Sequence, residues 1–256
     1  MSVIVEKVSF SIKDVKILDN ISLEFYGGEL LTILGPNGSG KSSLLNILSG
    51  DLIPSDGKIS FDNMSLKNIP IEKRAVTRSV MSQTQRIMYD FSVKEIIEMG
   101  WIENESSDQF SFVQALDIVS KDCEIDHLLN RSINNLSGGE QRRVHFARTL
   151  IQLWKKSNNK EPRYIFLDEP TANLDLYYEI NLIKILKKKV AEGFGVFLIL
   201  HDLNLAFKFS NRVAFLKDGK LVCIGSPLEV FDEKLLSDIY GMSISVDKKH
   251  KRVSYY

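Results

Sequence analysis

The sequence predicts an α/β fold in which helices cover both faces of a parallel sheet. Two apolar runs, YIFLDEP and GVFLILHDL, predict buried strands, and the amphipathic segment between them, DLYYEINLIKILKKKVAEG, predicts a helix that ends at Gly193. A third apolar run, LLTILG, leads through glycine-rich sequence into KSSLLNILSG, in the order strand, loop, helix. Strands that alternate with helices favour a parallel sheet, and continuous apolar runs indicate strands that are buried on both faces.

The remaining segments predict an antiparallel β layer and a helical insertion. Near the N-terminus, VIVEKVSFSI, KILDNISLEF and GKISFDN alternate as half-buried strands do, and from about Phe91 to Trp154 the apolar residues recur at helical spacing. NRVAFLKDGKLVCIGSP predicts a hairpin that turns at Asp218-Gly219, and PLEVFDEKLLSDIYG predicts a single closing helix. We interpret the last segment, SISVDKKHKRVSYY, as a strand pair, with a regulatory tail as the alternative.

Composition narrows the possible partners and the cellular compartment. The 256 residues carry 33 basic and 33 acidic side chains, so no net charge is available to hold a nucleic acid, and we expect no nucleic-acid partner. Cys123 and Cys223 lie far apart without metal-ligand spacing, which fits a reducing compartment. The N-terminus reads as a charged strand and not as a signal peptide, and apolar stretches reach only about six residues, as in GVFLIL. We therefore expect a cytoplasmic protein whose membrane role, if it has one, comes through a partner.

The segment GPNGSGKS, Gly35 to Ser42, has the pattern G-x-x-x-x-G-K-[ST] between a predicted strand and a predicted helix. Glycines let backbone N–H groups turn toward phosphate oxygens, and the helix N-terminus adds partial positive charge. Lys41 can reach the β- and γ-phosphates, and the Ser42 hydroxyl can bind Mg²⁺. The nucleotide-binding residues expected here are Gly35, Pro36, Asn37, Gly38, Ser39, Gly40, Lys41, Ser42 and Ser43.

The strand YIFLDEP ends in two acidic residues with different expected roles. Mg²⁺ prefers carboxylate oxygen, so Asp168 at the strand end suits the metal shell. Glu169, one residue further, suits a general base that polarises the attacking water.

A second phosphate-binding pattern lies in NNLSGGEQRRVHFAR, Asn134 to Arg148. Its serine and glycines stand at a predicted helix start, yet it contains no nucleophile and no metal-ligand cluster. We expect Arg142, Arg143 and Arg148 on the helix surface or at an interface, and not at a ligand.

These motifs resemble those of the ATP-binding cassette ATPases, in the order that the family has them. LSGGE, Leu136 to Glu140, is similar to the family's signature sequence, Gln83 in RSVMSQ to its glutamine loop, NLD with Asp175 to its D-loop, and His201 in LILHDL to its switch histidine. The family also places an aromatic ring against adenine; Phe10 stands at a suitable distance upstream, with Ile12 as the neighbouring candidate.

The resemblance covers nearly the whole chain and implies one cassette domain over residues 1–256. Its RecA-like core and β subdomain would comprise residues 1–85 and 156–241, its helical subdomain residues 86–155, and its C-terminal tail residues 242–256.

The resemblance also implies a shared ATP site. Two such cassettes close head to tail, so that Ser137, Gly138 and Gly139 would cap the γ-phosphate held by the partner's phosphate loop. Glu169, His201, Gln83 and Lys41 would be catalytic, Mg²⁺ would be held by Ser42, Gln83 and Asp168, and the cofactors would be ATP and Mg²⁺.

Three classes of cassette protein compete: a transporter ATPase, a soluble cassette that acts on ribosomes or DNA, and a degenerate subunit that does not hydrolyse ATP. Ribosomal members carry two cassettes and DNA-repair members a long coiled coil, neither of which is present, and the catalytic motifs are intact. Transport is therefore the expected role. It implies two separate permease subunits and, indirectly, a periplasmic or lipoprotein substrate-binding protein, with this chain peripheral on the cytoplasmic face of the inner membrane.

Segments such as FSVKEIIEMG and LLSDIYG look like importer ATPases for iron-siderophores, haem and cobalamin. Within that group, LWKKSNNKEPRY, which replaces a short turn, is similar to the haem importer ATPases. We expect haem import, with a ferric siderophore or cobalamin as the alternative cargo.

Overall fold

The computed structural model describes residues 2–83, 89–102, 109–154 and 163–256. Within them, six strands form a central sheet in the order β10-β9-β3-β8-β7-β6. Neighbouring strands pair in parallel from β9 to β6, and only β10 runs antiparallel to its neighbour in this sheet. The bounds are β3 (Leu30–Leu34), β6 (Arg78–Met81), β7 (Tyr164–Asp168), β8 (Gly195–Ile199), β9 (Arg212–Lys217) and β10 (Lys220–Gly225). The predicted parallel sheet is confirmed.

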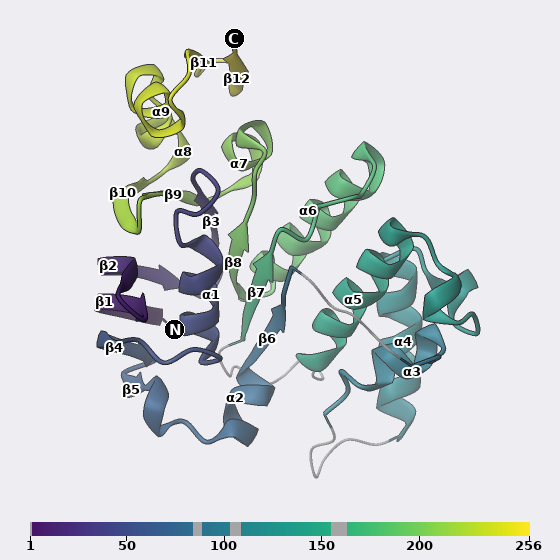
Figure 1. Ribbon diagram of the computed structural model, residues 1–256. Coiled ribbons are helices and arrows are strands. Elements are labelled where there is room, and N and C mark those ends of the chain that lie inside the picture. Colours follow the sequence, from purple (N-terminus) through teal and green to yellow (C-terminus); the bar gives the residue numbers. More distant parts are fainter. Residues whose placement is uncertain (1, 84–88, 103–108, 155–162) are drawn as a thin grey trace.

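The central strands are almost entirely apolar because both of their faces are covered. Every residue of β3, β7 and β8 is buried. Their side chains alternate between two cores: Phe166 and Phe197 face α1 (Lys41–Ser49) and the antiparallel sheet, whereas Leu167 and Leu198 face the helices on the other side. Figure 1 shows α1 between the two sheets, with α6 (Leu176–Ala191) on the opposite face of the central sheet.

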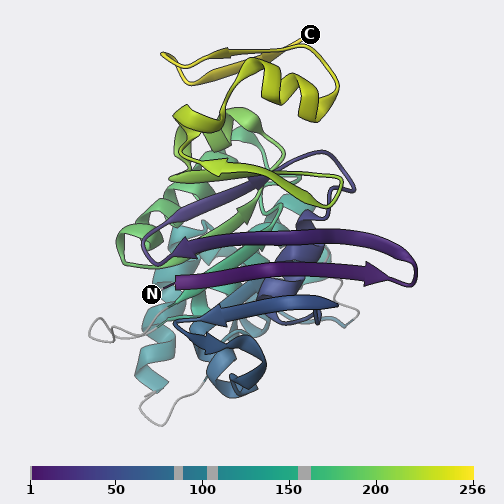
Figure 2. The ribbon, with the colours of Figure 1, turned by 90° about the vertical axis from the view of Figure 1, so that its left-hand side faces the viewer.

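The antiparallel sheet has the strand order β2-β1-β4-β5 and lies across one side of the molecule (Figure 2). Its bounds are β1 (Ser2–Ile12), β2 (Val15–Tyr26), β4 (Asp56–Phe61) and β5 (Met64–Ser65). The pairing of β1 with β2 is irregular, with register shifts on both sides of Phe10. Such shifts change which side chains face the core.

The helical insertion lies beyond the β6 and β7 edge of the central sheet (Figure 1). It contains α3 (Val93–Glu98), α4 (Gln109–Asp122) and α5 (Gly138–Gln152), and α2 (Ile71–Thr77) precedes β6. No helix within the described ranges is long and apolar enough to cross a lipid bilayer.

The C-terminal part packs beyond β9 and β10. The predicted hairpin is confirmed, with both Asp218 (φ 49°) and Gly219 (φ 74°) in the left-handed region that a type I′ turn needs. The single closing helix is wrong: the chain forms α8 (Pro227–Val230) and α9 (Glu233–Tyr240). The second helix starts afresh because Asp232 caps it, accepting a hydrogen bond from the backbone N–H of Leu235 at 2.9 Å.

The last residues form the predicted strand pair, β11 (Ile244–Asp247) with β12 (Arg252–Tyr255). Asn204 of α7 (Leu203–Phe209) ties this pair to the main body. Its side chain accepts from the Val253 N–H at 2.8 Å and donates to the Val253 carbonyl at 3.2 Å.

Candidate nucleotide-binding and catalytic site

The phosphate loop connects β3 to α1 through glycines at which a side chain would be strained. Gly35 has φ +147°, and a Cβ there would lie 2.0 Å from the carbonyl oxygen of Leu216. Gly40 has φ +97° at the N-cap of α1, and its Cβ would lie 2.6 Å from Leu18 Cδ2. The loop can therefore bend tightly and leave the N-terminal N–H groups of α1 free for an anion.

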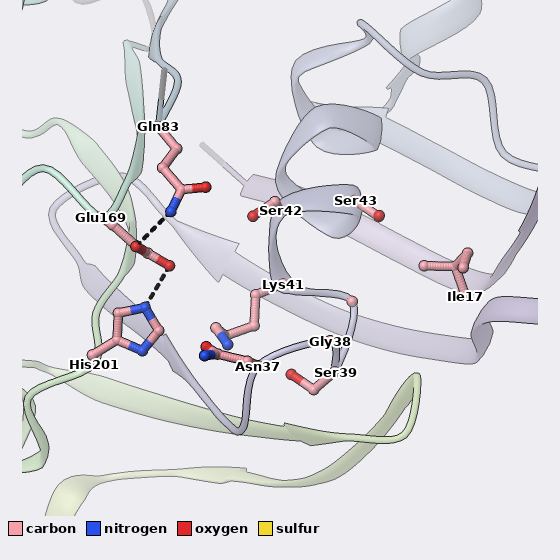
Figure 3. Close-up of a pocket in the computed structure, with 11 residues that line it drawn as sticks. Ile17, Asn37, Gly38, Ser39, Lys41, Ser42, Ser43, Gln83, Glu169 and His201 are labelled. Atoms are coloured by element: carbon pink, nitrogen blue, oxygen red, sulfur yellow. Dashed lines mark hydrogen bonds and ion pairs between the residues drawn. The ribbon is translucent and has the colours of Figure 1, made fainter.

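A cavity of about 530 Å³ opens over this loop. Figure 3 shows that strand ends distant in sequence contribute to it together with the loop. Its lining residues are Ile17, Asn37, Gly38, Ser39, Gly40, Lys41, Ser42, Ser43, Gln83, Glu169 and His201. The structure thus brings together most of the phosphate-loop residues, and all four of the expected catalytic side chains, Lys41 among them, line the cavity.

Lys41 folds back onto its own loop. Its ammonium donates to the carbonyl oxygens of Gly35 at 2.8 Å and Pro36 at 2.9 Å. Burial lowers the pKa of Lys41, while the carboxylates of Glu169 and Asp168 favour the charged form. An ammonium group that is buried beside two carboxylates is well placed to exchange these carbonyls for phosphate oxygens.

Asp168 is the most deeply buried carboxylate of the site, with 4% of its surface exposed. Burial raises its pKa, and a hydrogen bond from the Ser42 side chain works against that rise. Within the described residues its Oδ1 atom has no hydrogen-bond partner. A buried carboxylate oxygen without a partner beside a hydroxyl is a donor set that suits a hard divalent cation, so these residues fit the predicted Mg²⁺.

Glu169 is held between two side chains from neighbouring segments (Figure 3). Its Oε2 accepts a hydrogen bond from Gln83 Nε2 at 2.9 Å, and its Oε1 lies 2.5 Å from His201 Nε2. Its backbone has φ +49°, a strained value for a residue with a side chain. The end of β7 thus directs this carboxylate into the cavity, where it can accept a proton from water.

The signature segment lies outside this cavity and presents an exposed helix start. Ser137 is the N-cap of α5: its Oγ accepts from the Glu140 N–H at 3.3 Å, and its own N–H donates to Glu140 Oε2 at 2.7 Å. These hydrogen bonds lower the pKa of Glu140. A Cβ on Gly138 would meet no atom within 4 Å, and one on Gly139 would lie 3.2 Å from the Asn173 carbonyl oxygen.

Asp175 does not line the cavity either. It is the N-cap of α6 and accepts a hydrogen bond from the Tyr178 N–H at 3.1 Å. In the single chain its carboxylate therefore stabilises a helix start.

Phe10, the predicted adenine contact, does not line the cavity, so that contact stays a prediction. The side chain is 9% exposed and packs in the core of the antiparallel sheet. The burial alternation of β1 slips between Val5 and Val8, where the pairing with β2 shifts register, and Phe10 then faces the core together with Val8. The aliphatic Ile17 of β2 lines the cavity. Ile12, at the end of β1, is 54% exposed.

Two of the three arginines after the signature are also placed differently from the expectation. Arg143 is 7% exposed and donates to the carbonyl oxygens of Cys123 at 3.3 Å and Glu124 at 2.5 Å. Arg142 is half-buried and binds backbone carbonyls at the catalytic strand ends. Helical spacing marks a polar residue as exposed and cannot show carbonyl acceptors that come from another part of the chain.

Most of the insert that suggested haem, residues 155–162, lies outside the described residues. Of the residues just before it, Leu153 is 1% exposed and Trp154 packs against the helical core, with Lys189 Nζ 5.8 Å from its ring centroid.

Comparisons with known proteins agree with these observations. Residues 18–172 match the family model described as ABC transporter. The chain is 37% identical over 242 residues to the hemin import ATP-binding protein HmuV of Rhodopseudomonas palustris strain CGA009. The matching region covers 94% of this chain and 89% of that protein. It is 39% identical over 244 residues to HmuV of Escherichia coli O157:H7, with 95% and 93% covered.

Among solved structures, the dimeric bacterial ABC transporter cassette MJ0796 matches with a TM-score of 0.78 at 26% identity, over 88% of this chain and 98% of that one. The dimer of the same cassette with bound ADP and Pi matches with a TM-score of 0.75. The chain belongs to the ABC transporter family, as an ATPase that is coupled to transport.

Proposed function

We propose that this chain is the ATP-hydrolysing subunit of a haem importer, and that it works with a second copy of itself and two transmembrane permease subunits. The observation that carries the hydrolytic part is the Glu169 carboxylate, held at 2.9 Å by Gln83 and at 2.5 Å by His201 above the phosphate loop. The cargo assignment rests on the similarity to hemin import ATP-binding proteins over nearly the whole chain.

The nucleotide would lie in the cavity with its phosphates on the loop N–H groups and the N-terminus of α1. Lys41 would exchange the carbonyls of Gly35 and Pro36 for phosphate oxygens, and the adenine would lie against Ile17 at the other end of the cavity.

Asp168 and Ser42 would hold Mg²⁺, with Gln83 as the additional ligand. When bound, Mg²⁺ neutralises developing charge on the phosphates. The unpartnered Oδ1 of Asp168 supports this assignment.

Glu169 would accept the proton of the attacking water, which makes it the general base. Gln83 and His201 fix the direction of its carboxylate, and His201 would contact the γ-phosphate from the end of β8. The half-exposed side chain of His201 supports that second role, because it borders the open cavity.

Ser137, Gly138 and Gly139 would complete the ATP site of the partner subunit, with Asp175 at the same interface. They stand at the N-terminus of the 15-residue helix α5, away from their own chain's cavity. Gly138 supports this reading: it lies in a helix without positive φ and with open space around it, so nothing within the described chain requires a glycine. An external group that approaches the backbone closely would require one.

The permease subunits would place this chain on the cytoplasmic face of the inner membrane, with a periplasmic or lipoprotein haem-binding component on the other side. The cassette itself would not touch the cargo, so the cargo must be tested on the assembled transporter.

The test is uptake into proteoliposomes that contain the chain and its permease, with ATP inside and haem, a ferric siderophore or cobalamin presented by the binding component. We expect ATP-dependent uptake of haem alone, and loss of both uptake and ATPase activity in Glu169→Gln. Uptake of a siderophore or cobalamin in place of haem would overturn the cargo assignment, and a fully active Glu169→Gln would overturn the assignment of the base.

A further inference from the structure

The guanidinium of Arg142 gathers four backbone carbonyls from two separate catalytic segments. Its Nη1 donates to the Gln83 oxygen at 2.6 Å, and its Nη2 donates to the Asp168 oxygen at 3.0 Å and to the Glu169 oxygen. Its Nε completes the set with the Pro170 oxygen at 3.3 Å. One side chain of α5 thus joins the end of β7 to the backbone of Gln83.

These contacts need an arginine. A guanidinium offers five N–H donors in a fixed plane, whereas a lysine ammonium is a single point charge that can reach one or two of the carbonyls. Burial lowers the pKa of Arg142, but Asp168 and Glu169 favour its charged form. The charge strengthens each hydrogen bond to the carbonyls.

The carbonyls that Arg142 binds belong to the residues that aim the catalytic carboxylate. The Glu169 backbone is held at φ +49°, a conformation that persists only where its surroundings impose it. Its N–H is fixed by the Ile199 carbonyl at 3.2 Å, and its carbonyl is fixed by Arg142. The Gln83 side chain, whose backbone Arg142 also holds, donates to the Glu169 carboxylate at 2.9 Å.

The other end of this connection is the signature itself. Arg142 stands five residues after Ser137 on the same helix, about 7.5 Å along its axis. A helix moves as a rigid element over that distance, so a shift of its N-terminus displaces the guanidinium as well. Gly139 is a second place where α5 comes close to the segment after β7, since a Cβ on Gly139 would lie 3.2 Å from the Asn173 carbonyl oxygen.

We propose that Arg142 is a positioning residue that couples the two ATP sites of the dimer. When the ATP held by the partner subunit binds to the signature at the start of α5, Arg142 changes the position of Glu169 and Gln83 in its own chain. The proposal rests on the head-to-tail dimer of the proposed function. Arg142 does not line the nucleotide cavity, so its effect runs through the backbone it holds.

Arg143 provides a matched control on the same helix. It is buried, whereas Arg142 is half-buried, and it binds the two carbonyls of Cys123 and Glu124. Its guanidinium lies 3.8 Å from the ring centroid of Tyr178. Arg143→Lys therefore perturbs α5 as Arg142→Lys does, without changing a contact to the catalytic strand ends.

The experiment measures ATPase rate against ATP concentration for the transporter assembled with its permease. The wild type should show a Hill coefficient above 1, with two as the limit for two sites. Arg142→Lys should lower kcat roughly tenfold or more, bring the Hill coefficient to about 1 and change the half-saturating ATP concentration less than about threefold. Arg142→Gln should behave likewise with a larger loss of kcat, and Arg143→Lys should keep the wild-type kcat and Hill coefficient within about twofold.

Three results would overturn the coupling: a wild-type Hill coefficient of 1, an Arg142→Lys variant with wild-type kcat and cooperativity, or an equal loss of cooperativity in Arg143→Lys. Melting temperatures of both lysine variants identify any loss that comes from unfolding, and Arg142→Lys keeps the charge that the folded site needs. Failure of the proposed function has a different signature, since it leaves the wild-type complex without ATPase activity or leaves Glu169→Gln fully active.

Discussion

Replacing Gly138 by alanine should make the isolated chain more stable and the transporter less active. Gly138 is the first residue of α5, has no positive φ, and would present its Cβ to open space. Alanine fits there without strain and reduces the conformational freedom of the unfolded chain, which stabilises by about 0.4–1 kcal/mol. For a chain of this length that gain raises the melting temperature by about 1–4 °C.

Gly139 is the matched control for this substitution. Its Cβ would lie 3.2 Å from the Asn173 carbonyl oxygen, tighter than ordinary van der Waals contact. Gly139→Ala must therefore push that carbonyl away, and the stabilisation expected at Gly138 should be reduced or reversed. The two variants differ by one position and the same methyl group, so thermal unfolding of the isolated chains compares them directly.

The loss of activity comes from the proposed dimer. A methyl group on Gly138 would stand where the partner's phosphate approaches the backbone, so the ATPase rate of the assembled transporter should fall at least tenfold, equal to about 1.4 kcal/mol of transition-state stabilisation. A Gly138→Ala transporter that is both more stable and fully active would show that this helix start meets no nucleotide. A lower melting temperature would instead contradict the open space around Gly138.

Three further predictions follow from other side chains. His145 is 5% exposed and burial lowers its pKa to about 4, so the unfolded chain binds a proton near pH 6.5 that the folded chain binds only near pH 4. This difference should lower the free energy of unfolding by about 2 kcal/mol from pH 7 to pH 5. Urea unfolding should show a smaller fall in His145→Gln and an unchanged fall in the exposed His127→Gln. Asp168→Asn should remove the extra thermal protection that Mg²⁺ adds to ATP while ATP alone still protects, and an unchanged Mg²⁺ effect in a melting assay would refute its role as a ligand. Phe10→Leu should lower the free energy of unfolding by about 1 kcal/mol and leave the KM for ATP unchanged. Ile17→Ser should raise the KM for ATP. A raised KM in Phe10→Leu and an unchanged KM in Ile17→Ser would identify Phe10 as the adenine contact.

The sequence predicted the parts of the fold that follow from local periodicity. β3, β7 and β8 are almost entirely apolar because each strand is covered on both faces, and this is why their runs were recognisable as parallel strands. Once those strands were placed, the carboxyl ends of β7 and β8 had to lie side by side, as Asp168 and Ile199 do in the sheet. The proximity of Glu169 and His201 was predictable for the same reason.

The side chains whose surroundings the sequence did not predict are those whose neighbours come from elsewhere in the chain. Phe10 depends on the register shifts in β1, and a shift of one residue moves a side chain to the other face of a sheet. Arg142 depends on carbonyls supplied by Gln83 and the end of β7, which lie 59 and about 26 residues away in sequence. Neither environment leaves a trace in the local pattern of apolar and polar residues.

The groups proposed to touch phosphate or water are largely occupied within the single chain. Lys41 is bound to the carbonyls of its own loop, Ser137 to Glu140, and Glu169 to Gln83 and His201. Hydrogen bonds to charged groups each contribute about 1.5–3 kcal/mol, so nucleotide binding must offset the loss of several of them. A single cassette gains only the contacts of its own cavity, because the signature lies outside that cavity. Closure of two chains supplies the contacts of the cavity and of the partner's signature at once, which favours ATP binding and dimer closure as one cooperative event. A connection between the two sites, such as the proposed one through Arg142, would then link closure at one site to the catalytic geometry of the other.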